Sequence, residues 1–290
     1  MKEFYNNSKL GYRVNCSFVT LIPKKENPSS LLDYKPINLI NSPYKVLSKV
    51  LANRIKQVLP IVIDKAQSAF VGGINIVDGV LIANEVVDWW KKSKKKGLIL
   101  KLDFQKTYNT VNWNCLLQML SNFGFGSRWI RWIKECLESP RISILVNGSP
   151  SAELCPQKEL RQGDPLSPFL FNVVAEGLNI LLSRAKELRM IKRVTVGDRK
   201  VNISHLQFAD DTIIFCETEW AEIVAVKRIL RCFEVVTGLK INFHKSMICG
   251  VRVEEGLVAE FATKLNCLSH KLLLNYLGLP LGANLCRKQT

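Results

Sequence analysis

The 290-residue chain is poor in the residues that build several common kinds of site. It has three histidines, His205, His244 and His270, and no two of its cysteines form a CxxC pair. A histidine-ligated metal centre or a zinc cluster is therefore not expected. The nine cysteines are scattered, which favours free thiols in a reducing compartment over a disulfide framework.

Long hydrophobic runs and acidic residues are also scarce. No apolar stretch approaches the roughly 20 residues of a membrane-spanning helix, and residues 1–6 carry no apolar core of a signal peptide. Only 25 Asp and Glu oppose 41 Lys and Arg, so the formal net charge is +16. This excess favours a polyanionic partner, first the phosphate backbone of a nucleic acid and second an anionic membrane surface.

What is present is the composition of a folded protein, with 47% hydrophobic residues and length enough for one large domain or two lobes. Helical spacing of apolar residues predicts helices over 46–59 (ended by Pro60), 77–90, 113–120, 127–137, 171–181 (with Pro165 and Pro168 at its start), 219–236 and 254–265. Strands are predicted over 17–22, 98–104, 142–146, 200–207, 212–215 and 247–250, with a strand pair near 272–279. Residues 194–196 and 201–203 are predicted to form a further hairpin around Gly197-Asp198. This order lacks regular βαβ units and predicts an α+β fold, an antiparallel sheet with helices on one face.

The stretch with the clearest chemistry is FADD, which ends in Asp210 and Asp211. Strands 200–207 and 212–215 flank it as a hairpin, so its turn presents two adjacent carboxylates. Aspartate is a poor strand residue and is costly to bury, and a divalent cation such as Mg²⁺ would remove the repulsion between the pair. A solvated turn with two unrelated acids is the simpler alternative.

Another acid stands near the end of a second strand. Residues 98–104 are a continuous apolar run, typical of a strand buried on both faces, and the run carries Asp103. If this strand neighbours the FADD hairpin, three carboxylates converge. They could hold two divalent ions roughly 3.5–4 Å apart, which suits an in-line phosphoryl displacement. Without an ion the three charges would repel one another, so the metal-free alternative requires the acids to lie apart.

Seven sequence blocks resemble the motifs of reverse transcriptases and occur in the same order. They are LIPKK at 21–25, DYKPI at 33–37, KLDFQKTY at 101–108, RQGDPLSP at 161–168, FADD at 208–211, GLKINFHKS at 238–246 and YLGLPLG at 276–282. The chain is similar to the reverse transcriptase domain of LINE-type non-LTR retrotransposons of the kind abundant in plants. The resemblance spans nearly the whole sequence.

The resemblance implies a right-hand polymerase. Fingers are expected over residues 1–97, with part of 113–160 at the junction, and a palm over 98–290 that ends at a primer-grip-like motif near 276–282. No thumb is expected, and longer relatives carry an upstream endonuclease and downstream regions. The chain therefore resembles a remnant or partial product of a mobile element, and without a thumb it is expected to hold primer–template weakly.

The resemblance also implies substrates and roles. The expected partners are an RNA template, a DNA primer and dNTPs, with two Mg²⁺ ions as cofactors and Mn²⁺ as an alternative. The catalytic and metal-binding acids would be Asp103, Asp210 and Asp211. Contacts to the dNTP are expected from Tyr108, Gln162, Gly163, Lys245 and Lys35. Contacts to nucleic acid are expected from Lys24, Lys25, Tyr276, Leu277 and Gly278.

Several of these roles have simple physical reasons and simple alternatives. A rigid ring at Tyr108 would exclude a sugar 2′-hydroxyl and so select deoxynucleotides, although a core tyrosine is the alternative. Gly163 lets the backbone approach a ligand closely. Lys245 would donate a proton to the leaving pyrophosphate, and the alternative is an ordinary surface lysine. The lysine run 91–96 is either a solvated helix end that complements the helix dipole or a nucleic-acid contact.

Two departures from the family pattern bear on activity. Gly73-Ile74 stands where relatives have Gly-Arg, which removes a phosphate partner worth roughly 1–3 kcal/mol. Asn109 replaces an acid beside Tyr108, outside the metal-binding positions. The alternatives to an active reverse transcriptase are an inactive domain that still binds RNA or RNA–DNA duplex, and an RNA-templated RNA polymerase, against which Tyr108 argues.

Overall fold

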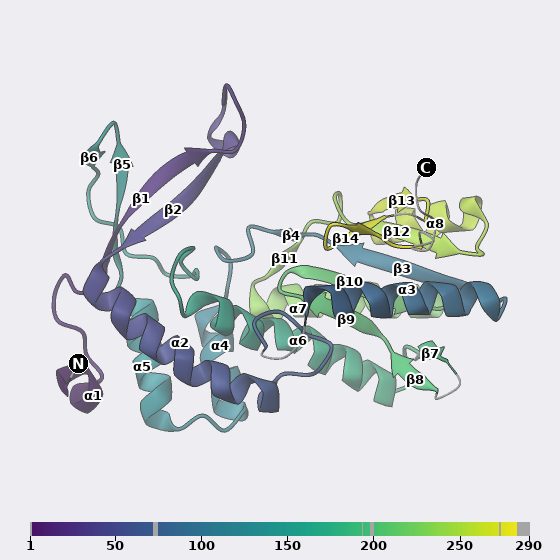
Figure 1. The fold of residues 1–290 in the computed structure, drawn as a ribbon, viewed down its shortest axis with the longest axis horizontal. Helices are drawn as coiled ribbons and strands as arrows, with labels where there is room; N and C mark the ends of the chain where they lie inside the picture. Colours follow the sequence, from purple (N-terminus) through teal and green to yellow (C-terminus); the bar gives the residue numbers. More distant parts are fainter. Residues whose placement is uncertain (1, 72–74, 193, 198–199, 273, 283–290) are drawn as a thin grey trace. The chain divides into compact units, whose positions relative to one another are not determined.

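The computed structural model describes residues 2–71, 75–192, 194–197, 200–272 and 274–282 (Figure 1). The chain forms two compact units, each built from two separate segments. The first unit comprises residues 1–62 and 108–174, and the second comprises 63–107 and 175–290. These borders differ from the predicted division into fingers and palm, because 63–97 belongs with 98–107 and 108–174 belongs with the amino-terminal segment. The functional division into fingers and palm stays a prediction.

The first unit combines a mixed sheet with helices. Its elements are α1 (Lys2–Asn7), β1 (Cys16–Pro23), a 3-10 turn (Leu31–Asp33), β2 (Tyr34–Ile40), α2 (Ser42–Val62), α4 (Trp113–Asn122), α5 (Ser127–Glu138), β5 (Arg141–Val146), β6 (Ser149–Pro150) and the first part of α6 (Ser167–Glu187). The four-stranded sheet has the order β2-β1-β5-β6. β1 pairs antiparallel with β2 but parallel with β5, whose first residue lies far along the chain. Asn147 and Gly148 form the turn that joins β5 to β6, and both have positive φ, as is common for this residue pair in two-residue hairpins.

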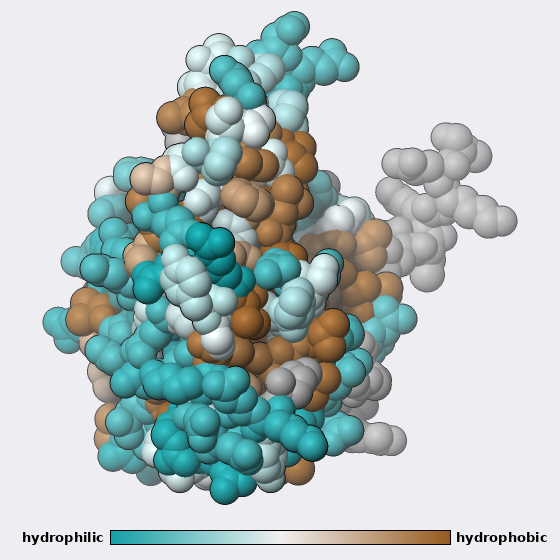
Figure 2. All heavy atoms as spheres, turned by 90° about the vertical axis from the view of Figure 1, so that its left-hand side faces the viewer, coloured by the Kyte–Doolittle hydropathy of each residue, from teal (hydrophilic) through white to brown (hydrophobic). Residues whose placement is uncertain are grey.

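Helix α2 differs from the prediction at its carboxyl end, because Pro60 lies inside the helix, which continues to Val62. A buried stripe on α2 includes Leu59, so packing of the last turn outweighs the one backbone hydrogen bond that proline removes. The opposite side of α2 exposes apolar side chains, Val46, Val50 and Ile61 among them. Figure 2 looks from the side of α1 and the β1–β2 hairpin and shows apolar patches interrupting a hydrophilic surface.

The second unit is built on a five-stranded sheet of order β13-β12-β3-β10-β9. Its strands and helices are α3 (Ile76–Lys92), β3 (Gly97–Leu102), β4 (Phe104–Gln105), the rest of α6, β7 (Val194–Val196), β8 (Val201–Ile203), β9 (His205–Phe208), β10 (Asp211–Cys216), α7 (Trp220–Thr237), β11 (Lys240–Ile241), β12 (Met247–Val251), α8 (Glu255–Leu265), β13 (Leu268–His270), β14 (Asn275–Tyr276) and β15 (Leu279–Pro280). Neighbouring strands are antiparallel except β12 and β13, which are parallel.

Helices cover both faces of this sheet, and the prediction of helices on one face was wrong. Ile99 and Phe215 belong to the core that includes Trp90 of α3. Leu98, on the other face, lies opposite Gly250, where a side chain would collide with Val258 of α8. The apolar run of β3 correctly predicted a strand that is buried on both faces. The error was the prediction that helices cover only one of those faces.

Two predicted strands are interrupted where the sheet changes partners. The predicted strand 200–207 divides at Ser204 into β8, which pairs with β7, and β9, which pairs with β10. The strand 98–104 divides at Asp103 into β3 and β4, and β4 pairs with β11. The pairing of β7 with β8 confirms the hairpin predicted for 194–196 and 201–203. The pairing of β4 with β11 was not predicted, because strand propensity does not specify a distant partner.

Two helix ends have the residues that local patterns favour there. Helix α7 ends at Gly238, which adopts φ +78° as a left-handed cap. Helix α3 has Lys91 and Lys92 in its last turn, where their charges complement the helix dipole. The cysteines in the described ranges are free. Within the same ranges, no helix has both the length and the apolar character needed to cross a bilayer.

Candidate active site

Strands β3 and β10 bring two of the predicted acids to the same end of the sheet. They are antiparallel neighbours with Leu102 opposite Thr212. Asp103 directly follows Leu102 and Asp211 directly precedes Thr212, so the two aspartates adjoin the last residue pair of this ladder. The folding of residues more than 100 positions apart in the chain therefore produces the carboxylate pair.

Asp210 lies one residue before Asp211, in the two-residue turn between β9 and β10, where Phe208 pairs with Asp211. The Asp210 side chain is exposed, whereas Asp103 and Asp211 are half-buried. Thr107, which is buried, donates a hydrogen bond from Oγ1 to Asp210 Oδ2 at 3.1 Å. Thr107 lies in the KLDFQKTY block but was not predicted as a site residue, and this contact was not foreseen.

The electrostatics of the site confirm that the three acids are near one another. Burial raises the pKa of Asp211, and the negative charges of Asp210 and Asp103 raise it further, while Lys101 opposes them. The mutual repulsion is the signature of a site that favours a cation. Among the described residues, no three His, Cys, Asp or Glu side chains are already gathered at metal-holding spacing. The carboxylates are therefore neighbours without forming a closed set of ligands.

The turn that carries Lys245 is fixed to Asp103 through its backbone. The Asn242 N–H donates to the Asp103 carbonyl at 2.7 Å, and the Asp103 N–H donates to Ser246 Oγ at 3.1 Å. Ser246 is buried between these contacts, whereas Lys245 is exposed. The predicted lysine is thus held on a turn that is attached to the acid-bearing strand. Ser246 was not predicted as a site residue, although it ends the GLKINFHKS block.

The primer-grip-like motif forms a tight hairpin beside the same sheet. Leu277 and Gly278, both with positive φ, form the turn between β14 and β15. The Tyr276 ring is 1% exposed and belongs to the core against α3. Burial and the charge of Asp211 raise the pKa of its hydroxyl. A contact between this motif and a nucleic acid would therefore have to come from the turn and not from the Tyr276 ring.

The predicted dNTP residues Tyr108, Gln162 and Gly163 belong to the first unit. The Tyr108 ring is half-buried and lies 5.5 Å from the Phe171 ring, centroid to centroid. Gly163 has φ +95°, and a Cβ there would lie 3.3 Å from the Asn38 carbonyl oxygen. The close approach that glycine permits is therefore made to strand β2.

A cavity of about 460 Å³ lies beside this loop in the first unit. It is lined by apolar side chains of the sheet and by the polar residues Asn38, Asn109, Arg161 and Gln162. Asn109, the departure from the family acid, therefore lies at a cavity wall. Ile74, the other departure, lies outside the described residues.

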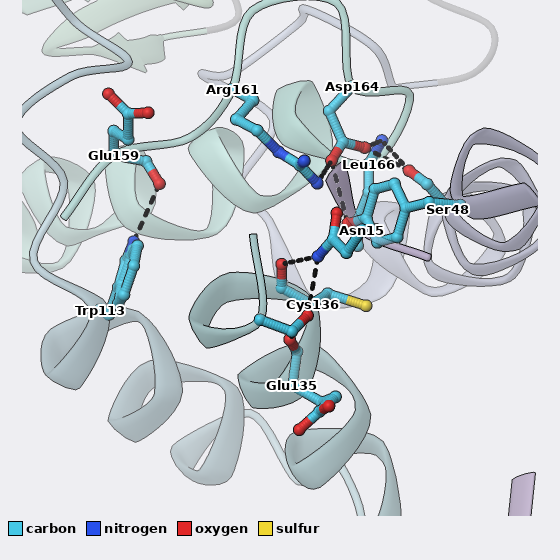
Figure 3. A network of polar contacts seen from close by, with 11 residues as sticks. Asn15, Ser48, Trp113, Glu135, Cys136, Glu159, Arg161, Asp164 and Leu166 are labelled. Atoms are coloured by element: carbon cyan, nitrogen blue, oxygen red, sulfur yellow. Dashed lines mark hydrogen bonds and ion pairs between the residues drawn. The ribbon is translucent and has the colours of Figure 1, made fainter. Parts of the chain in front are cut away.

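A buried network holds the loop that carries Gln162 and Gly163 (Figure 3). Asp164 accepts hydrogen bonds from Tyr44 Oη at 3.0 Å and from the Leu166 N–H at 3.0 Å, and from the Ser48 hydroxyl. Arg161 Nη2 forms an ion pair with Asp164 Oδ2 at 3.2 Å. The sequence block RQGDPLSP marked this loop, but only the structure shows that its two charged residues, Arg161 and Asp164, form an ion pair.

The predicted basic residues of the first unit lie on the β1–β2 hairpin. Lys24, Lys25 and Lys35 are exposed. Lys25 Nζ is 3.0 Å from Asp33 Oδ1, and this contact lowers the pKa of the Asp33 carboxyl. The hairpin therefore presents positive charge to solvent, as a phosphate-binding surface requires.

The fold agrees with that of known polymerases. Telomerase from Candida albicans, in a complex with the TWJ fragment of telomeric RNA, superposes with a TM-score of 0.60 at 11% identity, over 91% of this chain and 43% of that chain. Apo telomerase from Candida tropicalis, truncated from its C-terminal domain, gives a TM-score of 0.57 at 14% identity, over 84% of this chain and 52% of that one. At such identities the likeness shows a shared fold alone.

Sequence comparison identifies the family. The reverse transcriptase (RNA-dependent DNA polymerase) family matches residues 22–281, and the chain belongs to this family. It is 26% identical over 249 residues to the transposon TX1 uncharacterized 149 kDa protein of Xenopus laevis, covering 85% of this chain and 18% of that protein. It is 26% identical over 246 residues to the Pol polyprotein of retrotransposable element R2 of Popillia japonica, covering 82% of this chain and 32% of the polyprotein. The chain thus spans less than a third of the first of these relatives and about a third of the second.

Proposed function

We propose that this chain is the polymerase domain of a non-LTR retrotransposon and that it copies an RNA template into DNA. The observation that supports the proposal is that Asp103, which follows β3, and Asp211, the first residue of β10, adjoin the paired residues Leu102 and Thr212, with Asp210 in the neighbouring turn. The reaction joins the primer 3′-oxygen to the α-phosphorus of a dNTP. The bond to the leaving pyrophosphate breaks, and the 3′-hydroxyl loses its proton.

Asp103, Asp210 and Asp211 would hold the two divalent ions that this reaction needs. Carboxylate oxygens are the ligands that Mg²⁺ and Mn²⁺ prefer. The pKa of Asp211 is raised mainly by burial and further by the charges of Asp210 and Asp103, and this repulsion favours a cation beside them. When bound, such ions activate the 3′-hydroxyl and neutralise the triphosphate. Thr107 holds the exposed Asp210 side chain through Oδ2, and small movements of the three carboxylates would let them close around a cation.

Other residues receive roles from the family resemblance. Tyr108 would exclude ribonucleotides, and Gln162 and Gly163 would lie beside the incoming nucleotide. Lys245 would transfer a proton to the leaving pyrophosphate, and its exposed position leaves its amine accessible to a substrate. Lys24, Lys25 and Lys35 would hold phosphates, for which their exposure and the net charge of +16 are suited.

Primer extension tests the proposal directly. The purified chain is incubated with a poly(rA) template, an oligo(dT) primer, dTTP and Mg²⁺, and product length is measured. Asp103→Asn and Asp210→Asn are each expected to reduce synthesis by at least roughly 10³-fold, because each removes a charge that stabilises the transition state. Glu260→Gln, which changes an exposed acid on α8, is the matched control and is expected to leave synthesis unchanged.

Two results would contradict the proposal. Asp103→Asn that synthesises DNA at the wild-type rate would show that the carboxylate pair is not catalytic. A wild-type chain that makes no product but binds the RNA–DNA duplex, with binding retained in Asp210→Asn, would favour the second candidate function. That candidate is duplex or RNA binding without synthesis, and the net charge of +16 is the observation that favours it.

A further inference from the structure

The turn that carries Asp210 is supported by a short segment from the beginning of the second unit. Residues 66–69 run beside β9, where the Gln207 N–H donates to the Ala66 carbonyl at 2.7 Å and the Ser68 N–H donates to the Gln207 carbonyl at 2.9 Å. Gln67 and Gln207 form a parallel bridge. The segment therefore extends the sheet beyond its β9 edge and ends next to the Ala209–Asp210 turn.

The Gln67 side-chain amide hydrogen-bonds with both the N–H and the carbonyl of Ala209. Its Oε1 accepts the Ala209 N–H at 3.0 Å, and its Nε2 donates to the Ala209 carbonyl at the longer distance of 3.4 Å. The same Oε1 accepts the Ala69 N–H at 3.0 Å. Since two N–H groups point at one atom, that atom must be the oxygen, and this fixes the orientation of the amide. Gln67 is 1% exposed, so water does not compete for these bonds.

Ala209 has an unfavourable backbone conformation that this clamp can maintain. Its φ is +54°, in the left-handed region that glycine adopts readily and that a residue with a Cβ adopts at a cost. Turns of this type normally carry glycine or asparagine at such positions. Ala209 directly precedes Asp210, so its conformation sets the direction of the acidic pair. Strain next to a reactive group persists only where the surrounding structure maintains it.

We propose that Gln67 is a positioning residue, which holds Ala209 in the left-handed conformation and so directs Asp210 and Asp211. The effect on catalysis rests on the proposed polymerase function, whereas the clamp itself is a property of the folded chain. Without the amide, Ala209 relaxes toward negative φ, and the two carboxylates turn away from Asp103. Gln67 does not touch the substrate in this role.

The test uses the full chain and a variant that keeps the volume of the side chain. Gln67→Met fills the same space without hydrogen bonds. Ser68→Ala is the matched control, because Ser68 lies in the same segment and its hydroxyl contacts the Gln207 carbonyl of β9 and not the turn. Hydrogen exchange, followed by mass spectrometry on overlapping peptides that isolate the Ala209 amide, is expected to accelerate by about tenfold or more in Gln67→Met. Ser68→Ala is expected to leave this amide protected.

Kinetics supply the readouts that a purely structural role would not change. In primer extension, Gln67→Met is expected to lower kcat by roughly 10- to 100-fold through misplacement of the acids, with little change in KM for dTTP. Adding Ala209→Gly to Gln67→Met is expected to recover most of the lost rate, because glycine adopts positive φ without support. A structural role alone would give no such recovery.

The outcomes separate this proposal from the proposed function. An Ala209 amide that exchanges equally in the wild type and in Gln67→Met would overturn the clamp, whether or not DNA is made. A loss of kcat that equals the loss in Ser68→Ala, or that Ala209→Gly fails to relieve, would overturn the positioning role. If the wild type makes no product, the polymerase proposal fails, and the exchange measurement alone decides whether Gln67 holds the turn.

Discussion

Replacing Glu176 with glutamine is expected to stabilise the chain at alkaline pH and not at acidic pH. Glu176 is buried on α6, and burial raises the pKa of its carboxyl from 4.5 to about 7. Hydrogen bonds from Asn179 Nδ2 at 2.6 Å and from the Asp64 N–H at 3.2 Å lower this pKa, and the Asp64 charge raises it. Burial is the dominant influence, so the folded state prefers the protonated acid.

The sign and size of the effect follow from this shift. A carboxyl whose pKa is raised by folding weakens the folded state as pH rises from its unfolded pKa to its folded one. At about 1.4 kcal/mol per pKa unit, ionisation of Glu176 costs about 3 kcal/mol above pH 7 and almost nothing at pH 4. Glutamine avoids this cost but gives up one acceptor, worth about 1 kcal/mol. The expected net gain for Glu176→Gln is about 2 kcal/mol at pH 8, with a small loss at pH 4.

Urea unfolding at pH 4, 6 and 8 measures this difference. The wild type and Glu176→Gln are compared at each pH, with Glu260→Gln as an exposed control that should follow the wild type throughout. A stability difference between the wild type and Glu176→Gln that stays constant from pH 4 to pH 8 would refute the reasoning, because it would mean that the carboxyl does not change its ionisation on folding.

Three further predictions concern the site and its support. Thr107→Val removes the hydroxyl that contacts Asp210 and is expected to lower kcat in primer extension roughly 3- to 10-fold without abolishing synthesis; an unchanged kcat would contradict a supporting role. In Gly163→Ala the new Cβ is strained by the positive φ and also approaches the Asn38 carbonyl oxygen, whereas in Gly124→Ala only the positive φ is unfavourable. Thermal unfolding should therefore show a larger drop in Tm for Gly163→Ala than for Gly124→Ala. Asp164→Ala leaves its arginine partner buried and unpaired, and chemical unfolding should show a loss of about 3–5 kcal/mol; a loss under 1 kcal/mol would contradict this account.

Local patterns predicted the elements that carry the acids, and the long-range contacts around them could not be predicted. The apolar run of β3 and the alternation around Asp210 are properties of neighbouring residues, so the strands were found. The contact between Gln67 and Ala209 joins residues 142 positions apart, and nothing in a predicted loop indicates which turn it will support. Thr107 lies inside the KLDFQKTY block, and nothing in the block indicates that its hydroxyl reaches Asp210. Its hydroxyl gains a role because β3 and β10 pair, which the sequence does not specify by itself.

The same limit explains the errors in architecture. Whether helices cover one face of a sheet or both depends on which helix returns to which strand, and amphipathic helices such as α3 and α8 suit either arrangement. Pro60 signalled the end of a helix, but packing of Leu59 outweighed that signal. The chain crosses between the two compact units near residues 62, 107 and 174, and no change of composition marks these positions.

The parallel pairing of β1 with β5 has a consequence for how the nascent chain folds. Strand β1 ends at Pro23, but the strand that completes its free edge begins only at Arg141. During synthesis one edge of β1 therefore keeps its backbone N–H and C=O groups unpaired until the ribosome has added more than 100 residues after β2. An unpaired strand edge is a template for intermolecular association. Any shortened copy of the gene that stops before residue 141 is expected to yield a product that aggregates or is degraded, whatever its catalytic residues.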